Sequence, residues 1–406
     1  MTARVLEIEL TQQLADRDVA GYAEALLLLR FNRRPIGCVR VASTSGILRA
    51  KDVQAAIETD EELQKQLRAV TLKGWLRQHE AQHNPLPLTW SVVICTRNRT
   101  ADLRRCLDSL RAITTPKGEI IVVDNAPSDD ATAQLAAQYP VRYLREDRVG
   151  LNWARSHGAR AAAGDIVIFT DDDVVVDQGW IEAMLEPFSH PRVAAVTGLT
   201  LPLELETAAQ ELFEMYGGFG RGFRRREFDY TVIPPAAAGM VGAGANMALR
   251  RQLINSMRLF DAELDCGTVA RTGGDAYAFY QLLVEGYQIV YTPDALTWHR
   301  HRRDYASLRR TLAGYSVGGF AFLMRCWLHH GDWQAIAVAG SWFRHDHLRQ
   351  LAQTLLRRPR ALPLDLVLAQ IVACPIGLWA YFASRKRERT NGSSSMPAME
   401  TSGGGA

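Results

Sequence analysis

Between residues 90 and about 300, short apolar runs rich in Ile and Val alternate with longer stretches in which apolar residues recur every three or four positions. The first repeats are a strand at 90–95 with a helix at 101–112, and a strand at 119–123 with a helix at 129–138. This alternation is typical of an α/β domain with parallel strands. We therefore predict a mixed, mostly parallel sheet flanked by helices over residues 88–303.

The segment before this domain follows a different pattern. Residues 1–85 contain a strand pair around 25–30 and 37–41 and then helical stretches at 51–80, so we expect a small accessory α+β unit. The sequence Gln-His-Asn-Pro-Leu-Pro at 82–87 is typical of a linker.

The segment after the domain, residues 304–386, is mostly helical and apolar, and 387–406 is expected to be a disordered tail. The apolar run at 366–384 is long enough for a marginal membrane span, with a basic flank that would lie in the cytoplasm. Asp365 and the modest overall hydropathy instead favour a helix packed on the domain or lying in the membrane interface. We expect the peripheral arrangement and keep the single span as the alternative.

Composition indicates which partners and which cellular compartment we expect for the chain. Its 406 residues carry a net charge of only +3, which predicts no nucleic-acid partner. The six cysteines show no Cys-x-x-Cys spacing and are typical of reduced, intracellular thiols. Because the N-terminus has no apolar signal-peptide core, we expect a cytoplasmic protein, either free or at the cytoplasmic face of a membrane.

The most informative stretch is a strand at 166–170 that ends in three carboxylates, Asp171, Asp172 and Asp173. Alternate side chains of a strand share a face, so Asp171 and Asp173 point one way and Asp172 the other. Neighbouring carboxylates repel unless a positive group lies between them. The pair at 171 and 173 is therefore a candidate Mg²⁺ or Mn²⁺ site, and an acidic solvated turn is the alternative.

Two other predicted strands also end in polar residues. Thr96-Arg97-Asn98-Arg99 follows the first strand, and Asp124-Asn125 follows the second. Ligands of such sheets bind at the carboxyl ends of the strands, so these groups are expected to meet the three carboxylates there. A cationic loop, a lone Asp and an acidic pair together predict a nucleotide-diphosphate site.

At this point the chain resembles the inverting, nucleotide-sugar-dependent glycosyltransferases of family 2, which have the GT-A fold. The resemblance covers roughly residues 88–303. The matching stretches are Ser-Val-Val-Ile-Cys-Thr-Arg-Asn-Arg (91–99), Glu-Ile-Ile-Val-Val-Asp-Asn (119–125), Gly-Leu-Asn-Trp-Ala-Arg-Ser-His-Gly (150–158), Gly-Asp-Ile-Val-Ile-Phe-Thr-Asp-Asp-Asp (164–173), Gly-Ala-Asn-Met-Ala (244–248) and Gly-Gly-Asp (273–275).

The resemblance implies a role for each matching residue. Asp171 and Asp173 would be the metal-binding Asp-x-Asp, with His299 completing the metal shell, although a surface role suits either His of 298–303 taken alone. Asn246 would lie on the acceptor side. The residues expected to bind the donor are Thr96, Arg97, Arg99, Asp124, Asn152, Arg155 and Asp172.

The resemblance also implies a catalytic base. Asp275, at the start of a helix predicted at 276–286, matches the carboxylate that takes the proton of the acceptor hydroxyl. A plain helix N-cap is the alternative role. Gly274 and Tyr277 stand where many members have further acids, so the match is incomplete here. The Arg-rich stretch 221–226 is either a mobile acceptor lid or a solvated loop.

We therefore expect a metal-assisted, inverting transfer of sugar from a nucleotide-diphosphate donor, UDP first among them, to a hydroxyl of a glycan, lipid-linked or small-molecule acceptor. A non-catalytic homologue that acts as a binding or scaffold subunit is the alternative. A haloacid-dehalogenase-like phosphatase is disfavoured because Lys386 is the only Lys beyond Asp173, and a Rossmann dehydrogenase because Gly-Ala-Gly-Ala-Asn at 242–246 lacks the third glycine.

Overall fold

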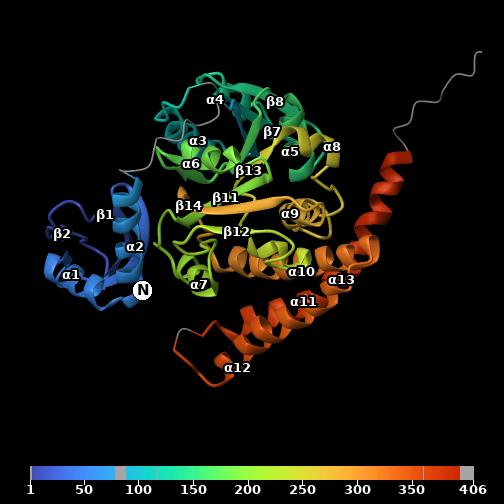
Figure 1. Cartoon of the computed structure of the whole chain (residues 1–406). Coiled ribbons are helices and arrows are strands. Elements are labelled where there is room, and N and C mark those ends of the chain that lie inside the picture. The colour runs from blue at the N-terminus through green and yellow to red at the C-terminus, as the bar shows by residue number, and fades with distance from the viewer. Residues whose placement is uncertain (1, 78–87, 117, 360, 394–406) are drawn as a thin grey trace, which may run out of the picture.

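The computed structural model describes residues 2–77, 88–116, 118–359 and 361–393, and the side chains of 2–72, 88–116, 118–359 and 361–384. The linker predicted at 82–87 and residues 394–406 of the predicted tail lie outside the described residues. Figure 1 shows a small N-terminal unit beside a sheet domain, with a group of long C-terminal helices along another side of that domain.

The N-terminal unit is a three-stranded sheet covered by two helices. The predicted strand pair is observed as β3 (Glu24–Phe31) and β4 (Arg34–Ala42), which pair antiparallel around a turn at Asn32 and Arg33 with φ of 50° and 67°. A further strand that the sequence pattern does not predict, β1 (Ala3–Glu9), pairs parallel with β3. The remaining elements are β2 (Arg17–Asp18), β5 (Ile47–Leu48), α1 (Ala50–Thr59) and α2 (Glu61–Arg77).

The central domain is built on one mixed sheet with the order β10-β14-β11-β13-β9-β6-β7-β8, and β12 pairs with β14. Parallel pairing joins β9, β6, β7 and β8, and also β11 and β14, whereas β13 is antiparallel to both of its neighbours. The strands are β6 (Trp90–Thr96), β7 (Gly118–Asn125), β8 (Arg142–Glu146), β9 (Ile166–Asp171), β10 (Val174–Val176), β11 (Val193–Pro202), β12 (Arg226–Phe228), β13 (Asn246–Arg250) and β14 (Gln288–His299).

Both faces of this sheet are buried, which explains why its strands are nearly all apolar. Val92 and Ile94 of β6 point into one core, and Val93 and Cys95 into the other. The first core is closed by α3 (Thr100–Arg111), α4 (Ala131–Ala136) and α6 (Trp180–Leu185), and the second by α5 (Leu151–Ala161), α8 (Arg251–Met257) and α9 (Gly274–Val284). The predicted α/β class is confirmed.

Strand β14 differs from the sequence prediction. The sequence predicts a strand over 288–292, directly before Pro293, but β14 continues to His299. The pairing with β11 shifts register between Thr292 and Thr297, so Pro293 lies in an irregular stretch where the ladder needs no donor. His299 is therefore the last residue of a strand of the sheet, which fixes its direction.

The N-terminal unit is attached to the sheet domain by polar contacts. Arg30 donates to Asp177 Oδ2 at 2.6 Å, and Arg40 donates to Glu211 Oε2 at 2.7 Å on α7 (Ala208–Tyr216). The backbone N–H of Ala3 donates to Leu205 O at 3.0 Å.

The C-terminal part is helical, as predicted. It comprises α10 (Tyr305–His330), α11 (Gln334–Trp342), α12 (Arg349–Leu355) and α13 (Leu364–Ser393). Helix α13 continues beyond residue 386, where the tail was expected to begin, because Arg, Lys and Glu at 385–389 are good helix formers. Among the described residues, one stretch, Leu364–Ser384, is long and apolar enough to span a membrane, but 44% of its most apolar window is buried inside the protein.

Candidate active site

The three carboxylates lie at the turn between β9 and β10, at the carboxyl end of β9. Asp171 pairs in register with Cys95 of β6, which places the end of β9 next to the loop that follows β6. The side chain of Asp173 is 3% exposed, whereas that of Asp171 is 34% exposed. The opening of the site is therefore on the Asp171 side.

Asp171, Asp173 and His299 form a cluster, as the sequence predicts. Each offers one ligand atom, and these atoms all lie within 4.8 Å of one another. His299 reaches the cluster because its strand pairs antiparallel with β10, opposite Val174. Two carboxylate oxygens and an imidazole nitrogen fit Mn²⁺ well, and they fit Mg²⁺ less closely because that ion prefers oxygen.

The charges of this cluster depend strongly on each other. Although burial acts to raise the pKa of Asp173, His299 and Arg99 hold that pKa well below its usual range. Burial acts to lower the pKa of His299, but the adjacent Asp173, 3.1 Å from His299 Nε2, raises it overall. Asp173 therefore stays ionised, which a metal ligand requires.

Asp172 is held by two side chains, that of Thr96 at the end of β6 and that of Arg99 in the loop after it. Thr96 Oγ1 donates to Asp172 Oδ2 at 2.7 Å, and Arg99 Nη1 donates to Asp172 Oδ1 at 3.0 Å and to Asp173 Oδ2 at 2.8 Å. Burial, with the charge of Asp173 added, raises the pKa of Asp172 to about 7. The predicted donor residues Thr96, Arg99 and Asp172 are thus one hydrogen-bonded network beside the metal cluster.

Asp124, at the end of β7, is fully buried. Tyr143 donates to Asp124 Oδ2 at 3.0 Å, and no described residue donates to Oδ1 in hydrogen-bonding geometry. Burial raises the pKa of this carboxyl group. Oδ1 is therefore an unpaired acceptor but is itself covered by protein, and the role of Asp124 in nucleotide binding stays a prediction.

The predicted base, Asp275, is in the first turn of α9, but Gly273 and not Asp275 is the N-cap residue. Asp275 Oδ2 accepts from the backbone N–H of Gly244 at 2.8 Å, and Arg155 Nη2 lies 3.9 Å from Asp171 Oδ1. A Cβ atom at Gly244 would be 2.6 Å from Arg155 Nη2 and 3.0 Å from Asp275 Oδ2. The buried Arg155 guanidinium therefore lies between the metal cluster and Asp275, and the absence of a side chain at 244 makes room for both.

Three residues that the sequence predicts to bind ligands are either exposed to solvent or bonded to other protein groups. Arg97 is exposed to solvent. Asn152 donates to Asp261 O at 2.6 Å and Leu264 O at 3.1 Å, so its amide holds the 261–265 loop. The buried Asn246 amide accepts from Trp180 Nε1 at 2.8 Å and donates to Leu199 O and Ala295 O, so all its polar atoms have protein partners. The ligand roles assigned to these three stay predictions.

A group behind the metal cluster was not anticipated from the sequence. His301 Nε2 lies 2.7 Å from Glu214 Oε1 on α7, and Phe219 packs against His299 at a ring-centre distance of 4.9 Å. The spacing of His299 and His301 is the signal that two histidines share one side of an extended segment. Glu214 has no such signal, since it is distant in sequence.

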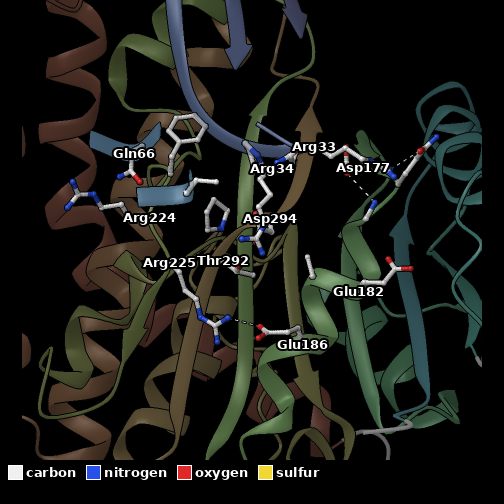
Figure 2. A pocket seen from close by; sticks show the side chains of 18 of the residues that line it. Arg33, Arg34, Gln66, Asp177, Glu182, Glu186, Arg224, Arg225, Thr292 and Asp294 are labelled. Carbon is white, nitrogen blue, oxygen red and sulfur yellow. Dashed lines mark hydrogen bonds and ion pairs between the residues drawn. The ribbon is translucent and has the colours of Figure 1, made fainter. Parts of the chain in front are cut away.

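Two arginines of the Arg-rich stretch 221–226 lie away from the metal cluster. Arg224 pairs with Glu62 and Arg225 with Glu186, each at 2.6 Å. Both arginines line a cleft of about 1040 Å³ between the N-terminal unit and the sheet domain, together with Arg33, Arg34 and Asp294 (Figure 2). Among the described residues, none of the predicted site residues lines this cleft.

A family model described as glycosyl transferase family 2 matches residues 91–255, which contain the ends of β6, β7 and β9. Residues 91–255 are therefore a glycosyl transferase family 2 domain. The matched region stops before Asp275 and His299, so the placement of these two in the site comes from the geometry.

Relatives that are similar to the chain in sequence are also named as glycosyltransferases. A pre-mycofactocin glycosyltransferase of Mycobacterium tuberculosis is 27% identical over 275 residues, which cover 65% of this chain and 54% of the relative. Glycosyltransferase AglE of Haloferax volcanii is 26% identical over 223 residues, covering 52% and 67%. The chain thus spans about half the length of the mycobacterial relative. A solved structure, the mannosyltransferase PcManGT of Pyrobaculum calidifontis in complex with GDP-Man and Mn²⁺, is 17% identical with a TM-score of 0.43, covering 82% of this chain and 85% of that one.

Proposed function

We propose that this family 2 glycosyltransferase moves a sugar from a nucleotide-diphosphate donor to an acceptor hydroxyl with inversion, assisted by a divalent metal. The observation that carries the proposal is the Asp171, Asp173 and His299 cluster at the strand ends, with ligand atoms within 4.8 Å. Its place in a family 2 domain, beside Arg99 and Arg155, supports a diphosphate ligand, since guanidinium groups recognise phosphate oxygens well.

The donor would lie across the ends of β6, β7 and β9. Asp124 Oδ1, which has no hydrogen-bond donor among the described residues, would accept from the base or ribose, and the diphosphate would extend towards the metal cluster. When bound, a divalent ion would offset the negative charge that develops on the departing diphosphate. Arg99 supplies fixed positive charge at the same place, because Asp172 and Asp173 hold its guanidinium.

Asp275 would take the proton of the acceptor. The acceptor oxygen forms a bond to the anomeric carbon while the bond to the diphosphate oxygen breaks on the opposite side, and the hydroxyl proton passes to the Asp275 carboxylate. The backbone N–H of Gly244 holds that carboxylate, so it is positioned before the acceptor arrives. Arg155 stands between this base and the metal cluster, and although burial acts to lower the pKa of its guanidinium, the charges of Asp171 and Asp275 raise that pKa overall.

The test is a donor screen with the full chain. UDP, GDP, dTDP and CDP sugars are each incubated with Mn²⁺, with Mg²⁺ or with EDTA, and the released nucleotide diphosphate is measured. The acceptor panel contains glycans, polyprenyl phosphates and small hydroxylated molecules, with pre-mycofactocin included after the name of the mycobacterial relative. We expect one donor class to react in Mn²⁺ and to fail in EDTA. Binding of a nucleotide sugar without turnover in any arm would indicate a non-catalytic homologue.

A further inference from the structure

Helix α13 carries a row of exposed apolar side chains. Leu368 and Ile376 are each 44% exposed, Val372 is 60%, Trp379 is 62% and Phe382 is 53%. Steps of four and three residues place these five side chains on one side of a helix. Single exposed apolar residues are ordinary on protein surfaces, but a continuous row along a helix marks a surface that meets an apolar partner.

The other side of α13 is packed on α10. A Cβ atom at Gly377 would be 2.4 Å from Val317 O, so the two helices touch there without any gap. Ala373 and Ala380 are buried in one cluster with Val317. Because α13 is bound along this side, its apolar row faces away from the rest of the protein.

The region around this row is also rich in exposed apolar side chains. Of the 21 large hydrophobic side chains that are exposed in the described part of the chain, 13 fall between residues 328 and 382. They include Trp333 at 70% and, after α12, the pair Leu355 and Leu356 at 64% and 67%. In Figure 1, α11 and α12 lie beside α13 on the side of the molecule away from the sheet.

Basic residues stand at both ends of this apolar surface. Exposed Arg357 and Arg358 follow the Leu355-Leu356 pair, and beyond Ser384 the helix continues with the sequence Arg-Lys-Arg-Glu-Arg at 385–389. The sequence between 366 and 384 has no charged residue. An apolar surface that contains Trp333 and Trp379 and has basic residues at its ends is complementary to the headgroup boundary of an anionic bilayer.

A second copy of the chain fits this surface less well. A two-fold contact along the row would bring the ends of two copies together, and because basic residues outnumber the acids Asp365 and Glu388 at these ends, like charges would repel. A single transmembrane span also fits poorly, because α13 would have to leave α10 or draw it into the bilayer. Helix α10 carries Arg309, Arg310 and Arg325, whose burial in hydrocarbon is costly.

We propose that α13 and the adjoining α11–α12 region dock in the plane of an anionic membrane surface, with the apolar row in the headgroup and acyl boundary. The basic ends assign the cytoplasmic leaflet, where anionic lipids are concentrated. This inference does not rest on the proposed transfer reaction, because α13 carries none of the site residues.

Flotation of the full chain with vesicles tests the proposal. One set contains phosphatidylcholine alone, and the other phosphatidylcholine with phosphatidylserine. We expect the protein to float with the anionic set and to be released by high salt or by an alkaline carbonate wash. Val372→Glu and Trp379→Glu should each lower the bound fraction about tenfold, because they place a charge where apolar contact forms.

Val232→Glu is the matched control, since Val232 is also 60% exposed but lies in a loop of the sheet domain. It should leave flotation unchanged. Three results would overturn the proposal: no flotation with either vesicle set, resistance to the carbonate wash, or a dimer in solution that Val372→Glu dissociates. Because flotation needs neither donor nor acceptor, its failure is distinguishable from failure of the transfer assay.

Discussion

The Nδ1 atoms of His299 and His301 lie 3.2 Å apart, so one ring donates a hydrogen bond to the other. His301 Nε2 faces the Glu214 carboxylate at 2.7 Å and must carry its proton there. Burial lowers the pKa of His301 and favours its neutral form, in which Nδ1 then accepts. His299 therefore donates from Nδ1 and turns Nε2, its potential metal-binding nitrogen, towards Asp173.

This relationship predicts that His301 tunes metal affinity without touching the metal. In His301→Ala, His299 loses the acceptor that fixes its ring, and the affinity for Mn²⁺ should fall by ~10–100-fold. Titration calorimetry of Mn²⁺ into the metal-free protein measures it, without need of a substrate. His301→Asn, whose amide oxygen can accept from Nδ1, should retain more of the affinity. Equal Mn²⁺ affinity in the wild type and His301→Ala would show that the pair has no such role.

Asp173→Ala should abolish the part of donor binding that depends on metal. The variant removes one of three ligand atoms and frees His299 and Arg99 from their shared partner. Calorimetry with the active nucleotide sugar, in Mn²⁺ and in EDTA, should show a clear difference for the wild type and none for the variant. Asp172→Asn is the control, because Asp172 faces Thr96 and Arg99 and should keep the difference. An undiminished Mn²⁺ effect in Asp173→Ala would contradict the site.

Asp275→Asn should slow the transfer reaction without weakening donor binding. Asn can still accept from the backbone N–H of Gly244, so the fold of the site is kept, but it cannot take a proton. Transfer should fall by ~10²–10⁴ while the dissociation constant of the donor stays nearly the same. Initial rates and calorimetry on the same preparation give both values. A variant with full activity would remove Asp275 from the mechanism.

The placing of Asp171 and Asp173 together could be predicted from the sequence because an apolar strand that ends in Asp-x-Asp is a local pattern. His299 was reached through the resemblance, but the length of β14 was not, since the register shift that accommodates Pro293 depends on pairing with β11. Glu214 could not be predicted because only the fold brings α7 against His301. Strand β1 could not be predicted for a similar reason, because its partner β3 is distant in sequence and the pairing is parallel.

Two amides show the limit of motif reasoning most clearly. Asn152 and Asn246 match family motifs and so were expected to contact ligands, yet both amides bond to protein groups. A sequence pattern reports that a polar side chain is present but not whether it faces a ligand or satisfies backbone groups in the interior. Asp124, by contrast, is buried with one unpaired oxygen, and this difference depends on the three-dimensional surroundings of each side chain.

Asn246→Ala should therefore reduce stability rather than acceptor affinity alone. The change leaves Trp180 Nε1, Leu199 O and Ala295 O without the Asn246 amide inside the protein. The free energy of unfolding should fall by about 3 kcal/mol. Urea denaturation followed by tryptophan fluorescence measures the loss. Wild-type stability with a raised acceptor KM would instead support the acceptor role predicted from the sequence.

Asp265 predicts how stability depends on pH. Its side chain is 2% exposed, Oδ2 accepts from the Asn152 backbone N–H at 2.9 Å, and Oδ1 has no hydrogen-bond partner among the described residues. Burial raises the pKa of Asp265 to about 7 from 3.8. The folded state then holds this proton more tightly than the unfolded chain, so the stabilisation is complete below about pH 4 and is lost as the pH rises through about 7.

Asp265→Asn should remove this dependence, because the amide is neutral at every pH and its oxygen can still accept from the Asn152 N–H. Other buried carboxyl groups also titrate in this range, so the useful quantity is the difference in unfolding free energy between variant and wild type. We expect that difference to be smallest at about pH 4 and to shift in favour of the variant as the pH rises to about 8. Urea denaturation across this range measures it. A difference that is constant with pH, or that grows towards acid, would mean that Asp265 is already ionised in the folded protein, held by the first turn of α5 and the charge of Arg155.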